Sequence, residues 1–99
     1  MPNYVLTNKA LDDLSKIWDY TFEVWSEAQA DKYYYMIIAS CEELGNREVA
    51  GKLYEGVDNE LLGYRVGQHI IFYRHNKRDN IEVLRILHSR MDLKNRLDE

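Results

Sequence analysis

The order of its predicted elements places this chain in the α+β class, as one domain over residues 1–99. In the first half of the chain, apolar residues recur at the three- and four-residue spacing of amphipathic helices. In the second half, three runs rich in β-branched and aromatic residues are separated by turn signals. We therefore expect an N-terminal strand, an antiparallel helix hairpin, a three-stranded antiparallel sheet and a short C-terminal tail or helix.

The run Tyr4–Leu6 predicts the N-terminal strand, and Thr7 or Asn8 offers an N-cap for the helix that follows. The expected apolar stripe of this first helix consists of Leu11, Leu14, Trp18, Thr21 and Trp25. A Ser-x-x-Gln capping box at Ser26 predicts the start of a second helix, and Gly45 followed by Asn46 predicts its end. The expected buried stripe of the second helix consists of Ala30, Tyr33, Ile37, Cys41 and Leu44.

Almost no loop separates the two helices, so they should fold back on each other with Trp18 and Trp25 in the core. Three consecutive tyrosines, at positions 33–35, cover most of the circumference of the second helix. At least one of them should be exposed. Exposed tyrosine is enriched at protein interfaces, whereas the alternative interpretation is a tyrosine snorkelling at the edge of the core.

Residues 47–60 are expected to form a loop, because glycines and a DN pair interrupt them. The three expected strands cover residues 61–66, 69–74 and 81–87. Alternation places Ile70, Phe72, Val83 and Leu87 on one face, with Arg74 and Arg85 beside them. It places Ile71, Tyr73, Leu84 and Ile86 on the other face. The hairpin can cover only one face, so we expect the arginine-bearing face to be open and to bind another segment or protein.

The net charge of -4 is unevenly distributed along the chain. Residues 1–60 carry five Lys or Arg against twelve Asp or Glu, whereas residues 61–99 carry eight against five. The first part should repel phosphates, and the second part could accept an acidic partner or substrate. The alternative is a pair of solvated faces with no target.

The composition also argues against several classes of protein. The single cysteine, Cys41, excludes an internal disulfide, and no Cys/His spacing typical of a zinc site is present. No metal and no cofactor is therefore expected. The N-terminus lacks the pattern of a signal peptide, and no apolar run approaches the ~20 residues that cross a bilayer. We expect a cytoplasmic protein without a membrane partner.

Four segments in series resemble the ParE toxins of the RelE/ParE toxin superfamily, namely residues 6–21, 25–34, 63–74 and 81–92. They contain the patterns WxxxQAxxY, GxHxIFYR and RILHxRMD. The resemblance implies the superfamily fold and a type II toxin–antitoxin module, with roles in growth inhibition and plasmid stabilisation. It further implies that DNA gyrase is the target, that inhibition needs no catalysis, and that the C-terminal segment of a ParD-type antitoxin wraps the toxin in a hetero-oligomer.

Two groups of residues are expected to bind these partners. The antitoxin is expected to contact Tyr34, Ile70, Phe72, Arg74, Val83, Arg85 and Leu87. The cellular target is expected to contact Arg90, Met91, Asp92, Lys94 and Arg96. No direct sequence-specific binding of nucleic acid is expected.

The alternative function within the same superfamily is a RelE-like, ribosome-dependent mRNA interferase. Its chemistry needs a base for the ribose 2′-OH and cations for the phosphorane, and Arg65, Arg85 and His88 are the candidates. The acidic net charge and the scarcity of lysine after residue 52 argue against this function. The structural interpretation of His88 is a strand-end histidine bonded to backbone, and His69 and His75 are expected at the surface.

Overall fold

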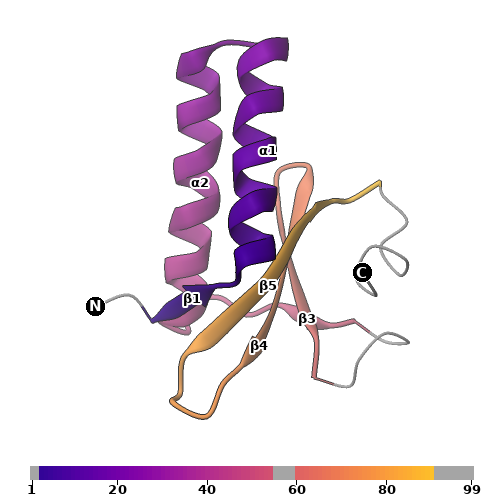
Figure 1. Cartoon of the computed structure of the whole chain (residues 1–99). Coiled ribbons are helices and arrows are strands. Elements are labelled where there is room, and N and C mark those ends of the chain that lie inside the picture. Colours follow the sequence, from indigo (N-terminus) through magenta and orange to yellow (C-terminus); the bar gives the residue numbers. More distant parts are fainter. Residues whose placement is uncertain (1–2, 55–59, 91–99) are drawn as a thin grey trace.

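Two helices cover one face of a mixed sheet in the computed structural model, which describes residues 3–54 and 60–90 (Figure 1). The elements are β1 (Tyr4–Leu6), α1 (Asn8–Val24), α2 (Glu27–Gly45), β2 (Lys52–Leu53), β3 (Leu62–Val66), β4 (His69–His75) and β5 (Ile81–His88). The strand order is β1-β5-β4-β3-β2, with β1 parallel to β5 and the other neighbours antiparallel. The predicted α+β class and element order are confirmed.

The sheet has five strands in the described residues, because β1 joins it and β2 adds a short edge strand. Strand β2 lies within residues 47–60, which were expected to be loop throughout. Its two residues are too few to show an alternating pattern, and only their pairing with β3 makes them a strand. The three predicted strands are present within about one residue of their expected bounds.

Both helices begin where the capping residues predict. The Thr7 hydroxyl oxygen accepts a hydrogen bond from the Ala10 amide at 3.1 Å, and Ser26 does the same for Gln29 at 3.1 Å. Helix α2 ends at Gly45, with Asn46 as its C-cap. Neither helix in the described part of the chain is long and apolar enough to cross a membrane.

The main core lies between the hairpin and the sheet. Its buried residues are Ala10, Leu14, Ile37, Cys41, Leu44, Val66, Ile71, Tyr73, Ile81, Val83 and Ile86. The predicted stripe of α2 is confirmed, with Tyr33 half-buried at its edge. Burial raises the pKa of the Cys41 thiol to about 12, so this cysteine is an inert core residue.

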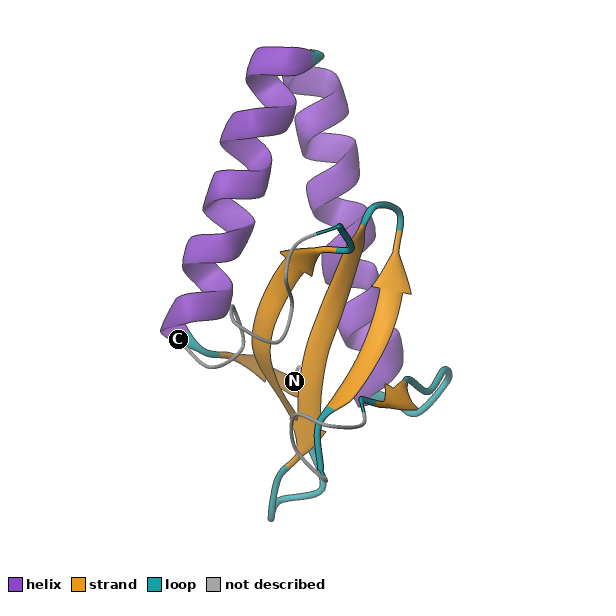
Figure 2. Cartoon of the chain, turned by 90° about the vertical axis from the view of Figure 1, so that its right-hand side faces the viewer, coloured by secondary structure: helices purple, strands orange, loops and turns teal. Residues whose placement is uncertain are grey.

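The predicted stripe of α1 is wrong at three positions. Leu11 is 50% exposed and Trp25 is 74% exposed, while Trp18 is only half-buried. The buried side is instead formed by Ala10, Asp13, Leu14 and Thr21. The helix hairpin extends past the end of the sheet (Figure 2), so Trp25, at its tip, has no sheet to pack against. Leu11 lies near the start of α1 and is exposed because it is about a quarter turn from the buried side. Helical spacing alone could not reveal how far the sheet reaches.

A β-bulge exchanges the predicted faces of Val83 and Leu84. Phe72 pairs with Arg85 and Tyr73 pairs with Val83, which leaves Leu84 as an extra residue on β5. Because each strand residue alternates in direction, one extra residue reverses the faces beyond it. Val83 is therefore part of the main core, whereas Leu84 packs with Leu61, Phe72 and Leu87 on the opposite face. The prediction that both faces of β5 are apolar is confirmed.

Candidate functional site

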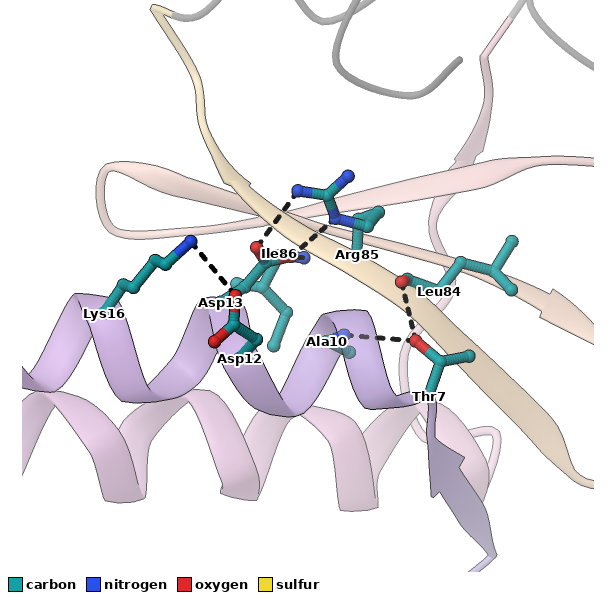
Figure 3. Close-up of polar contacts among 8 residues, drawn as sticks. All are labelled: Thr7, Ala10, Asp12, Asp13, Lys16, Leu84, Arg85 and Ile86. Carbon is teal, nitrogen blue, oxygen red and sulfur yellow. Dashed lines mark hydrogen bonds and ion pairs between the residues drawn. The ribbon is translucent and has the colours of Figure 1, made fainter. Parts of the chain in front are cut away.

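The edge of β5 changes partner half-way along the strand. Strand β1 pairs with Ile81, Glu82 and Val83 only. Beyond that point, side chains at the start of α1 bond the edge of β5 (Figure 3). The Thr7 hydroxyl donates to the Leu84 carbonyl at 2.8 Å, while its oxygen also caps α1. Six residues further along, on α1, the Asp13 carboxylate accepts from the Ile86 amide at 3.0 Å.

Asp13 and Arg85 form a largely buried ion pair. Arg85 Nε lies 2.8 Å from Asp13 Oδ2, and Arg85 Nη2 lies 3.1 Å from Asp13 Oδ1. The side chains are only 9% exposed for Asp13 and 15% exposed for Arg85. This corrects the expectation that Arg85 lies on an open basic face. Its guanidinium turns from β5 toward α1, because a buried carboxylate with two accepting oxygens matches its two parallel donors.

A hollow of about 500 Å³ adjoins this ion pair, between α1 and the C-terminal end of β5. Its lining consists of Asp13, Lys16, Ile17, Tyr20, His69, Arg85, Ile86, Leu87, His88 and Arg90. The sequence offered no sign that the middle of α1 would meet the ends of β4 and β5. Within residues 3–54 and 60–90, no group of three or more His, Cys, Asp or Glu side chains is placed to hold a metal ion.

Two histidines form one wall of this hollow. His69 and His88 pair across β4 and β5, with ring centroids 5.2 Å apart and an interplanar angle of 77°. His88 Nδ1 accepts from the Arg90 amide at 3.1 Å, as the structural interpretation of a strand-end histidine predicts. In the neutral ring the proton therefore resides on Nε2.

His69 is half-buried, which corrects its predicted place at the surface, while His75 is exposed as predicted. The Tyr33 hydroxyl lies 2.7 Å from His69 Nδ1 and 3.2 Å from the Val66 carbonyl oxygen. The hydroxyl donates its single proton to the Val66 carbonyl and accepts from the Gln68 amide at 3.0 Å, so a neutral His69 satisfies the short contact by donating its Nδ1–H to the hydroxyl. Burial first, and then the neighbouring His88, lower the pKa of His69 to about 4. His69 is consequently neutral at pH 7.

The three residues of the mRNA interferase alternative do not form one site. Arg85 and His88 line the hollow together. Arg65 instead lines a separate hollow of about 490 Å³ beside β2, and its Nε donates to the Gly67 carbonyl at 3.1 Å. Arg85 is also bound to Asp13. A phosphorane needs several cations around one point, and Arg65 is too far from the other two residues to act with them as predicted.

The sheet face opposite the hairpin retains few of the exposed groups expected for antitoxin binding. Phe72 and Leu87 are buried there, where the Tyr54 ring meets Phe72 edge-on at 5.0 Å. Val83 belongs to the main core, and Arg74 is paired with Glu82 at 3.1 Å. Ile70 is half-buried, and Tyr34, on α2, is exposed.

The exposed aromatic residues that α1 contributes to the surface of the hairpin were not predicted. Leu11, Trp18 and Phe22 on α1, with its C-cap residue Trp25, recur every three to seven residues, about a quarter turn from the buried side of the helix. Trp18 and Phe22 stack at 5.3 Å, and the Trp18 indole donates to Asp31 on α2 at 3.0 Å. One turn beyond Asp31 lie Tyr34 and Tyr35, both exposed as the tyrosine run predicts. We call this surface, formed by Leu11, Trp18, Phe22, Trp25, Tyr34 and Tyr35, the hairpin flank.

Comparison with known families decides what kind of protein this is. A family model described as ParE toxin of type II toxin-antitoxin system, parDE, matches residues 4–93. The chain belongs to the ParE toxin family. The resemblance inferred from the sequence patterns is thereby confirmed, and the family match spans both helices and every strand of the fold.

Named relatives support the same family. The protein called Toxin ParE1 from Mycobacterium tuberculosis (strain CDC 1551 / Oshkosh) is 33% identical over 94 residues, covering 91% of this chain and 92% of the relative. Toxin ParE1 from Caulobacter vibrioides is 34% identical over 95 residues, covering 93% and 94%. A structure described as the chromosomal ParDE TA system from P. aeruginosa matches with a TM-score of 0.73 at 23% identity, covering 89% of this chain and 96% of that one. This last likeness shows a shared fold.

For this ParE toxin, the residues expected to contact the cellular target lie at the end of the chain. Arg90 is exposed at the rim of the hollow. Met91, Asp92, Lys94 and Arg96 lie outside the described residues.

Proposed function

We propose that this ParE toxin is neutralised by direct binding of a ParD-type antitoxin, and that it inhibits DNA gyrase by binding rather than by catalysis. The observation that carries the proposal is the family match over residues 4–93, together with relatives that are aligned over more than nine-tenths of both chains. The separation of Arg65 from Arg85 and His88 argues in the same direction, because the three residues predicted for RNA cleavage do not line one hollow.

The hairpin flank is the better candidate for the antitoxin surface. A stable protein–protein interface is centred on exposed aromatic side chains, and Phe22 and Trp25 are 46% and 74% exposed. Glu27 and Asp31 are exposed on the same side of α2 as Tyr34. An antitoxin segment with apolar anchors and flanking Lys or Arg would match this surface. Ile70 and Arg74 remain secondary contact candidates on the sheet.

Affinity measurements on single variants test this surface. Phe22→Ala and Trp25→Ala should each weaken antitoxin binding by tenfold or more, since truncating an aromatic anchor typically costs about 2 kcal/mol. Tyr20→Ala is the matched control, because the exposure of Tyr20, 67%, lies between those of Phe22 and Trp25, but Tyr20 lies on the other side of α1, in the lining of the hollow. Equal affinities for all three variants in calorimetric titration would remove the hairpin flank from the interface.

Two activity assays separate the functions. The purified toxin should inhibit supercoiling by gyrase, and stoichiometric antitoxin should relieve that inhibition. It should not cleave mRNA on the ribosome. Ribosome-dependent cleavage without an effect on supercoiling would establish the mRNA interferase instead, with Arg85 and His88 as its first candidates for substitution.

A further inference from the structure

Most of the surface of the hollow between α1 and the end of β5 is apolar, and hydrogen-bond donors predominate among its polar side chains. Lys16, Arg85 and Arg90 can only donate, and His88 carries an N–H at Nε2 when neutral, because its Nδ1 accepts from the Arg90 amide. The one carboxylate in the lining, Asp13, already accepts three hydrogen bonds from β5. A ligand that enters this hollow therefore meets donors and little competing negative charge.

The charge balance of the hollow differs from that of the chain. Three cationic side chains line it, against the carboxylate of Asp13. At the rim, Asp12 lies 3.0 Å from the Lys16 ammonium (Figure 3), and with this residue included the cations still outnumber the carboxylates by three to two. The chain as a whole carries a net charge of -4. Arg85 is paired with Asp13, and Lys16 is paired with Asp12. The local excess of one positive charge therefore comes from Arg90, and such an excess attracts anions.

Apolar side chains and a rigid frame complete the hollow. Ile17, Ile86 and Leu87 contribute to its walls, and such low-polarity surroundings strengthen the interaction of donors with an anion. The Tyr33 hydroxyl holds the His69 ring, and the Arg90 amide holds the His88 ring. The Asp13 pair holds the Arg85 guanidinium against β5. Donors with fixed positions lose little freedom when they bind a ligand.

We propose that this hollow binds a phosphate-type oxyanion, with Lys16, Arg90 and His88 as its principal contacts. The ligand is either a free phosphate, a phosphomonoester, or one phosphodiester of a nucleic-acid backbone, because all three present the same acceptor oxygens. Contact with phosphate alone carries no sequence information. This property is independent of antitoxin binding and is tested on the isolated toxin.

The test is a titration followed by nuclear magnetic resonance of the His69 and His88 ring protons, at low ionic strength and neutral pH. His69→Gln and His88→Gln identify the two sets of signals. The three titrants are inorganic phosphate, a deoxynucleoside 5′-monophosphate and a short single-stranded oligodeoxynucleotide. At least one titrant should produce saturable shifts in both rings. Equal affinities for the three titrants indicate a site for small oxyanions. Tighter binding of the oligonucleotide than of the two small titrants indicates a contact to the nucleic-acid backbone.

Charge variants locate the binding. Lys16→Ala and Arg90→Ala should each weaken it about tenfold, the effect of losing one charge-assisted hydrogen bond. Lys32→Ala and Arg78→Ala, which remove exposed charges that do not line the hollow, should leave affinity unchanged. The proposal is overturned if no titrant gives saturable shifts, if sodium chloride at equal ionic strength reproduces them, or if all four variants weaken binding equally.

Discussion

At the scale of single residues, the Asp13 carboxylate connects α1 to the unpaired part of the β5 edge. It accepts two hydrogen bonds from Arg85 and one from the Ile86 amide, and its side chain is only 9% exposed. Removing one partner of a buried ion pair leaves the other charge uncompensated. Arg85 therefore contributes to the stability of the fold, and charge reversal at Arg85 would destabilise the protein.

The first prediction follows from this pair. Asp13→Ala should lower the free energy of unfolding by about 3–5 kcal/mol, as measured by urea denaturation. Asp12→Ala is the control, because the exposed Asp12–Lys16 pair should contribute only about 0–1 kcal/mol. Similar denaturation midpoints for the two variants would show that the buried pair does not hold α1 against β5.

The second prediction concerns pH. The pKa of His69 is about 4 in the folded chain, mainly through burial and then through His88, with Asp13 acting in the opposite direction. The unfolded value is 6.5, so the unfolded state binds more protons between these two values. Stability should accordingly be complete above pH ~6.5 and fall as the pH decreases toward ~4.

Denaturation of variants at pH ~7 and pH ~5 isolates this effect. His69→Gln should reduce the loss of stability between the two pH values. His75→Gln, at an exposed position, should retain the full loss. A pH dependence that survives in His69→Gln would assign the proton uptake to other groups.

At the scale of elements, α1 presents two different apolar sides. One packs against β5 and β1, and the other belongs to the hairpin flank. Leu11 and Leu14, one helical turn apart, belong to different sides. Leu14 is on the packed side and is 3% exposed, whereas Leu11 is on the hairpin flank and is 50% exposed. An apolar stripe alone therefore does not identify the buried side of this helix.

A third prediction uses this pair. Leu14→Ala should destabilise the toxin by about 2–5 kcal/mol, because it opens a cavity in the core. Leu11→Ala should change stability by no more than about 0.5 kcal/mol, as expected for a surface position. Urea midpoints of the two variants provide the comparison. A lower urea midpoint for Leu11→Ala than for Leu14→Ala would mean that α1 is rotated about its axis from the position described.

At the scale of the whole molecule, the proposed binding surfaces lie apart. The hairpin flank extends to the tip of the hairpin, around Trp25, whereas Arg90 follows the C-terminal end of β5. The fourth prediction is that deleting residues 93–99 reduces inhibition of gyrase while antitoxin affinity stays within about tenfold, or 1.4 kcal/mol. Supercoiling inhibition and antitoxin titration are measured on the same truncated protein.

Trp25→Ala should show the opposite pattern in the same two assays, with weakened antitoxin binding and full inhibition of gyrase. Loss of antitoxin binding by the truncated protein, with its inhibition of gyrase intact, would exchange the assignments of the two surfaces.

Local signals in the sequence determined the class, the order and the ends of most elements. The caps at Thr7 and Ser26, the stop at Gly45 and the alternation in three strands act over a few residues, so they are visible without a structure. Three short patterns in series were likewise enough to indicate the ParE family.

Only the tertiary structure decided which surfaces are free. The bulge that moves Val83 into the core, the pairing of Asp13 with Arg85 across 72 positions, and the exposure of Trp25 all depend on contacts between distant segments. Burial and pairing are set by what lies opposite a residue in space, and helical or strand periodicity does not contain that information. The sequence therefore predicted a partner-binding toxin with an exposed apolar surface on the sheet. In the structure the larger exposed apolar surface lies on the hairpin flank.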